Sequence, residues 1–115
     1  MRRLYLVLAC LILLLGLVHV SATFALFDAL TSRAVWFAGG GMAIIFTGVL
    51  NLLNRAYGAA APGVRWAAIG ANAAMTVFAA LAGVAGAASG AQLIVIVGLM
   101  AAATLVSLRP HPVSA

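Results

Sequence analysis

The sequence predicts an all-α fold, an integral membrane four-helix bundle that runs up-down-up-down. Of the 115 residues, 67% are hydrophobic and 6% are charged, whereas about a quarter of the residues in a soluble domain are charged. The apolar residues form four stretches of about the length that crosses a bilayer. All charged residues lie outside these stretches, so we expect one membrane domain over residues 1–115. The expected spans are 4–22, 34–54, 66–86 and 91–108.

The first span, 4–22, follows Arg2 and Arg3 and is rich in leucine. It is longer than the ~7–15 apolar residues of a signal peptide, so we count it as a membrane span. A linker over residues 23–33 follows and carries Asp28, the only acid in the chain. Its apolar residues predict that it lies along the membrane interface.

The second span, 34–54, lies between Arg33 and Arg55. It has three consecutive glycines, 39–41, near one end and the amides Asn51 and Asn54 near the other. Small residues let a neighbouring backbone come close, and amides in lipid need a partner. We therefore expect the neighbouring spans to pack against this one.

The third span, 66–86, follows a Pro-Gly turn signal and consists mostly of alanine and glycine. Such a helix gains from close packing, so we expect it inside the bundle. Residues 87–90 form a tight connection to the fourth span, 91–108, which ends at Arg109.

The arginines predict the orientation. Five of the six lie on one side of the four spans, and only Arg33 lies on the other. Short cytoplasmic loops carry the excess of positive charge. We expect both termini to be cytoplasmic, in a bacterial cytoplasmic (inner) membrane.

The polar residues of the cytoplasmic half form a candidate intramembrane cluster. Its members are Asn51, Asn54, Asn72, Thr104 and Ser107, and Tyr5 lies at the same depth. They either join helices by hydrogen bonds or line a small pocket for a head group or substrate. Asn72 lies roughly 9 Å along the helix axis from Trp66, so we expect it to bond to another member of the cluster.

A second candidate site lies on the outer side and consists of His19, Asp28 and Gln92. His19 is the only ionisable side chain within a span, which makes it a candidate for a ligand or proton site. Its position about one turn from the end of the span is also compatible with a structural role at the interface, and haem ligation is a further alternative. Haem held by two histidines would need two His19 residues across a dimer, because His111 lies on the opposite side.

The size and the four spans are similar to those of small multidrug resistance transporters. That resemblance implies a dimeric transporter, but those proteins carry a membrane glutamate and this chain has no glutamate. The chain loosely resembles small four-helix bacterial inner-membrane proteins of unknown function, through MRRLY at its start, GLVH at 16–19 and LN within the second span. That resemblance implies a fold and no activity.

We find no catalytic triad, carboxylate pair or phosphate loop, and no set of metal ligands. The dispersed arginines do not form a nucleic-acid surface. We expect a non-enzymatic accessory or packing subunit of a membrane complex, without a cofactor, whose partners are the lipid bilayer and a second copy or a larger membrane protein. The alternatives are a dimeric, proton-coupled small-molecule transporter and a haem- or quinone-binding anchor.

The orientation is testable with topology reporters. Fusions after Asp28 and Ser89 are expected to read periplasmic, and fusions after Ala60 and Ala115 cytoplasmic, because the arginine-rich side stays inside. A periplasmic carboxyl terminus would contradict the four-span topology.

Overall fold

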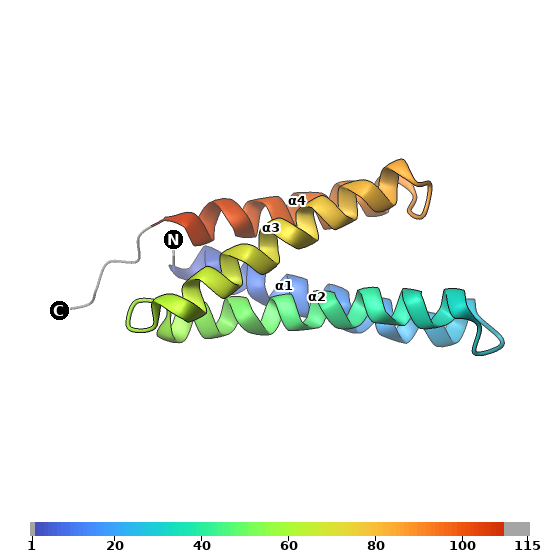
Figure 1. Ribbon diagram of the computed structural model, residues 1–115, viewed down its shortest axis with the longest axis horizontal. Coiled ribbons are helices and arrows are strands. Elements are labelled where there is room, and N and C mark those ends of the chain that lie inside the picture. The colour runs from blue at the N-terminus through green and yellow to red at the C-terminus, as the bar shows by residue number, and fades with distance from the viewer. Residues whose placement is uncertain (1, 110–115) are drawn as a thin grey trace.

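The computed structural model describes residues 2–109, and in this part of the chain all regular structure is helical (Figure 1). The helices are α1 (Arg2–Leu26), α2 (Ser32–Tyr57), α3 (Pro62–Val84) and α4 (Gly90–Leu108). Each is long and apolar enough to cross a membrane. The predicted all-α, four-helix architecture is therefore confirmed.

Local capping residues lengthen the helices beyond several of the predicted spans. Thr31 caps α2, because its hydroxyl oxygen accepts a hydrogen bond from the backbone N–H of Ala34 at 3.2 Å. Pro62 stands in the first turn of α3, where a missing N–H costs nothing. Because α1 continues to Leu26, the linker predicted over 23–33 shrinks to a loop over 27–31.

The third helix ends earlier than predicted. The span expected to reach residue 86 stops at Val84, because Gly86 adopts a positive φ of 71°. The backbone N–H of Gly86 donates to the carbonyl of Gly83 at 3.0 Å, and that of Ala87 to the carbonyl of Ala82 at 2.8 Å. This is a Schellman motif, in which glycine supplies the left-handed residue that ends the helix.

Helices α1 and α2 form a close-packed antiparallel hairpin. A methyl group placed on Gly48 would lie 2.9 Å from the backbone nitrogen of Leu13, and one on Gly16 would lie 2.7 Å from that of Ile45. No side chain fits between the two backbones at these points. The glycines therefore determine how closely α1 and α2 approach each other.

The four helices form two hairpins that diverge from one end to the other (Figure 1). At the closed end, where α1 and α3 begin and α2 and α4 end, the hairpins pack together. At the open end, which holds the α1–α2 loop and the α3–α4 turn, they separate. Between the two ends lies an apolar core of Ile12, Ile44, Met100 and Ala103.

Helix α3 lies at the outside of the bundle, so its predicted interior position is wrong. Its buried residues are confined to one face and are Ala68, Ile69, Asn72 and Ala79. Its large apolar side chains Val77, Phe78 and Leu81 are about 60% exposed. Alanine and glycine allow close packing on one face of a helix without requiring it on the others.

The close approach of α1 and α2 gives a stability prediction. Gly16→Ala is expected to destabilise the protein by about 1–3 kcal/mol, because the new methyl group meets backbone that cannot move aside. Gly70→Ala is the matched control: nothing lies within 4 Å of a methyl group there, and alanine should stabilise the exposed helix by about 0.5–1 kcal/mol. Unfolding in mixed micelles of sodium dodecyl sulfate measures both. Equal stability of the two variants would contradict the close contact.

Candidate functional site

Four polar side chains meet inside the closed end and form what we call the amide cluster. It consists of Tyr5 from α1, Asn51 and Asn54 from α2, and Asn72 from α3. None of them is more than 1% exposed. Three of the four helices therefore contribute to one buried hydrogen-bonded group.

Asn51 uses its full hydrogen-bonding capacity at the centre of the amide cluster. Its Nδ2 donates to Oδ1 of Asn72 at 2.7 Å and to the carbonyl of Thr47 at 2.8 Å. Its Oδ1 accepts from Nδ2 of Asn72 at 2.8 Å and from the hydroxyl of Tyr5 at 2.6 Å. An amide offers two donors and two lone pairs, and all four are used. Asn72 was predicted to bond to another member of the candidate cluster, and it does so with Asn51 as a reciprocal amide pair.

Tyr5 links the amide pair to Asn54. Its single hydroxyl proton goes to Asn51, so its oxygen accepts from Nδ2 of Asn54 at 2.8 Å. The Tyr5 hydroxyl thereby joins two residues one turn apart on α2. The first turn of α1 is fixed to the last turns of α2 by this contact.

Asn54 explains why glycine stands at position 58. A methyl group on Gly58 would overlap Oδ1 of Asn54, and it would lie 2.5 Å from the Asn54 carbonyl oxygen. That Oδ1 is buried and accepts no hydrogen bond from the described residues. The backbone N–H of Gly58 donates to the Asn54 carbonyl at 2.8 Å and closes the last turn of α2.

Thr104 and Ser107, the other predicted members of the cluster, bond within their own helix. The Thr104 hydroxyl donates to the carbonyl of Met100 at 2.8 Å. The Ser107 hydroxyl donates to the carbonyl of Thr104 at 2.8 Å. Both satisfy their hydroxyl protons on α4, so the structure brings Asn51, Asn54 and Asn72 together without them.

Arginine side chains close the same end at its surface. The Arg55 Nε donates to the backbone carbonyl of Arg2 at 3.3 Å, which joins the end of α2 to the start of α1. Arg65 donates from a terminal guanidinium nitrogen to the carbonyl of Leu108 at 3.0 Å, which joins α3 to the end of α4. A cation at a helix carboxyl terminus is also favoured by the helix dipole.

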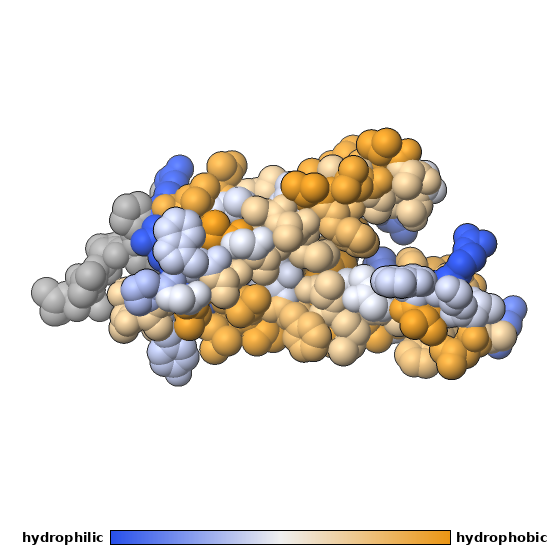
Figure 2. All heavy atoms as spheres, in the orientation of Figure 1, coloured by the Kyte–Doolittle hydropathy of each residue, from blue (hydrophilic) through white to orange (hydrophobic). Residues whose placement is uncertain are grey.

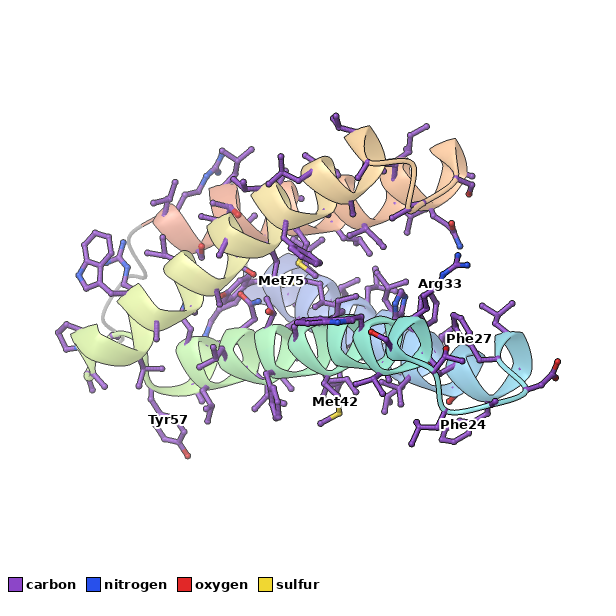
Figure 3. The ribbon with its side chains drawn as sticks, turned by 45° about the vertical axis from the view of Figure 1, so that its right-hand side comes forward. Phe24, Phe27, Arg33, Met42, Tyr57 and Met75 are labelled. Atoms are coloured by element: carbon purple, nitrogen blue, oxygen red, sulfur yellow. The ribbon has the colours of Figure 1, made fainter. Side chains whose placement is uncertain are left out.

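The open end holds a cleft of about 410 Å³ between the two hairpins, visible as a hollow in the surface (Figure 2). This volume lies in the range of about 300–1,000 Å³ that is typical of ligand pockets. Met75 lies at the inner end of the cleft, next to the core, and Arg33 lies at the mouth (Figure 3). Most of the other lining residues are aromatic, aliphatic or small and include Trp36, Phe37, Phe78, Ala82, Leu93 and Ile96.

His19 lines the cleft and is half-buried. Its ring stacks on that of Phe37, with centroids 3.9 Å apart and planes 16° apart. Phe37 in turn meets Phe27 at a centroid distance of 5.6 Å. The three rings form one wall of the cleft and give His19 a packing role beside any role in binding.

The three consecutive glycines of α2 have three different surroundings. A methyl group on Gly41 would lie 3.0 Å from the backbone nitrogen of Val20, so this glycine belongs to the close contact with α1. Gly40 lines the cleft, and nothing surrounds Gly39 within 4 Å. The expectation that small residues admit a neighbour therefore applies to Gly41.

The predicted outer site of His19, Asp28 and Gln92 is not joined by any hydrogen bond or ion pair that the structure describes. Asp28 is exposed in the α1–α2 loop. The Gln92 side chain accepts from the backbone N–H of Ser89 at 2.9 Å, and the Ser89 hydroxyl accepts from the backbone N–H of Gln92 at 3.4 Å. This capping box starts α4 and occupies Gln92. His111 lies outside the described residues.

Two features of these sites were not predicted from the sequence: the role of Tyr5 and the cleft. Tyr5 was placed at the right depth, but a tyrosine beside terminal arginines is equally typical of an interface position. The cleft was missed because it depends on how far the hairpins diverge. The only signal for it was three aromatic residues close together in sequence, in or just after the predicted linker: Phe27, Trp36 and Phe37.

No protein-family model, curated protein or solved structure matches this chain.

The reciprocal amide pair gives the next prediction. Asn72→Leu is expected to destabilise the protein by about 1 kcal/mol, since interhelical hydrogen bonds between membrane helices are modest in strength. Asn72→Asp should cost more, because it buries a charge among neutral side chains. Unfolding in mixed micelles measures both.

Thr104→Val is the matched control for Asn72→Leu. The Thr104 hydroxyl bonds only within α4, so its loss should change stability by no more than about 0.5 kcal/mol. An Asn72→Leu variant as stable as Thr104→Val would show that the amide pair contributes nothing to holding α2 and α3 together.

Proposed function

We propose that the chain is a multi-pass protein of a bacterial cytoplasmic membrane, with both termini in the cytoplasm. The support is the distribution of arginine. Arg55 and Arg65 bond to backbone at the ends of other helices, so the arginine-bearing helix ends form one face at the closed end. An excess of arginine marks the cytoplasmic side, and the cleft then opens on the periplasmic side.

The function that the geometry supports best is non-enzymatic binding of a small, largely apolar molecule that enters from the membrane or its outer interface, as in a small-molecule carrier. The cleft of about 410 Å³ carries this proposal. It is concave and mostly apolar, and its few polar groups lie with Ser32 and Arg33 at the mouth and His19 in the wall. Sites for small molecules combine these features.

The cleft differs from an ordinary gap between packed helices. Protein interiors are filled about as densely as organic crystals, and a void lined by apolar side chains loses their contacts. The closed end meets this standard through the amide cluster and the core. Because the same two hairpins leave the open end unfilled, an apolar occupant would complete their packing.

Native mass spectrometry of protein purified from membranes in a mild detergent tests this proposal. Ala82 is half-buried and lines the cleft, so Ala82→Phe would fill part of it. We expect the wild-type protein to retain a non-protein mass that Ala82→Phe loses, because the ring takes the place of the occupant.

Ala73→Phe is the matched control, because Ala73 is exposed on the same helix and does not line the cleft. It should retain the bound mass. Identical spectra for the wild type, Ala82→Phe and Ala73→Phe would refute binding in the cleft.

The second candidate function is the accessory subunit expected from the sequence. It is favoured by exposed small residues on the outer side of α3: Ala67, Gly70 and Ala74 follow one another at helical spacing. Nothing lies within 4 Å of a methyl group placed on Gly70. A helix of a partner protein could approach the α3 backbone closely there.

Affinity purification in a mild detergent tests the accessory role. A membrane protein that co-purifies with the wild type should be lost with Gly70→Leu, because the larger side chain keeps the partner helix away. Ala82→Phe, inside the cleft, should leave that partner bound. A partner that is retained by Gly70→Leu would show that the outer face of α3 is not its contact.

A further inference from the structure

We propose that the cleft selects a single-chain amphiphile with an anionic oxygen head group, such as a long-chain carboxylate, and that Arg33 holds the head group. This inference rests on the proposed binding function and names the chemistry of the occupant. The observation that carries it is Arg33, which has no hydrogen-bond or ion-pair partner among residues 2–109, at the mouth of a mostly apolar cleft (Figure 3).

Arg33 is available for a ligand. Its side chain points into the space between the two hairpins (Figure 3). It makes no hydrogen bond or ion pair with any of the residues 2–109, in contrast to Arg55 and Arg65, which bond to backbone carbonyls. A guanidinium offers five donors in a planar fork that matches a carboxylate or phosphate.

The backbone around Arg33 also favours an anionic head group. Arg33 lies in the first turn of α2, where the backbone N–H groups of Ser32 and Arg33 have no acceptor among the described residues. The positive end of the helix dipole lies there as well. Ser32 also lines the cleft and contributes a hydroxyl group.

The positive charge of Arg33 excludes a cationic amphiphile. Asp28 is the only acid in the chain; it is exposed in the α1–α2 loop and does not line the cleft. A cation in the cleft would therefore lie beside Arg33 without a carboxylate to balance it. An anion would have its counter-charge at the mouth.

The inner lining determines the rest of the molecule. The walls are mainly apolar from Trp36 and Phe37 inward to Ile44 and Met75. They provide few hydrogen-bonding groups for a ligand that is polar beyond its head group. A volume of about 410 Å³ lies near the lower end of the range for small-molecule pockets. One hydrocarbon chain fits this description better than a two-chain phospholipid.

Trp36 provides a direct measurement, because it lines the cleft, whereas Trp66, the only other tryptophan, lies at the closed end. In a Trp66→Phe background, all tryptophan fluorescence comes from Trp36. We would reconstitute this protein in phosphatidylcholine bilayers and titrate it with a brominated long-chain fatty acid, whose bromine atoms quench tryptophan on contact. The methyl ester of the same brominated acid is the uncharged control.

We expect saturable quenching of Trp36 by the acid, at about tenfold lower concentration than by the ester, as for loss of a charge-assisted hydrogen bond. Arg33→Gln should abolish this difference. Arg3→Gln, which removes the same charge from an exposed position at the closed end, should leave it unchanged. Ala82→Phe should remove saturable quenching by both compounds.

The outcomes separate the two proposals. Equal saturable quenching by acid and ester, unaffected by Arg33→Gln, would overturn head-group recognition and leave binding in the cleft intact. Quenching that is not saturable, and that Ala82→Phe does not alter, would overturn both. If phosphatidylglycerol in the bilayer displaces the acid completely at equal molar ratio, the head group belongs to a two-chain lipid and the single-chain assignment is wrong.

Discussion

The reciprocal hydrogen bonding of Asn51 with Asn72 is the interaction on which the arrangement of the helices depends. It links the α1–α2 hairpin to α3 through side-chain hydrogen bonds, and the Tyr5 hydroxyl extends it to α1. Buried amides in an apolar bundle cannot hydrogen-bond to water, so they must bond to each other. Their partners therefore determine the register of the helices. Each bond is modest in energy. Their effect is to select one arrangement among many apolar contacts of similar strength.

The hydrogen bonds join the two hairpins at the closed end. At the open end, the distance between the hairpins depends on the size of the side chains there. At the closed end, directed hydrogen bonds hold three helices together. At the open end, small residues such as Gly40, Ala79 and Ala82 line the cleft without filling it. The same two hairpins thus form a hydrogen-bonded closed end and a mostly apolar cleft at the open end. Ligand sites in helical bundles commonly lie between helices in this way.

The sequence predicted well those features that follow from the length and the apolar composition of each helix. Backbone groups must be satisfied internally, so the four apolar stretches had to be helical. The depth of Asn72 likewise required a partner within the bundle, which it has in Asn51. Helix ends were less predictable, because Thr31, Ser89 and Gly86 act through local geometry that extends or stops a helix by a few residues.

What the sequence did not predict depends on how helices fit side by side. The many alanines and glycines of α3 are compatible with a central helix and with an outer one. The shapes of the helix surfaces decide between the two positions. Helices α1 and α2 already pack closely on each other at Gly16 and Gly48, so α3 cannot lie between them. Helix α3 then has one buried face. It pairs with α4, and both helices diverge from α2 toward the open end. The cleft is a consequence of this fit, and so is the position of Arg33 at its mouth, without a side-chain partner among residues 2–109. In the orientation that we propose, Arg33 is the one arginine on the periplasmic side. An anionic molecule entering the cleft from that side would meet it first.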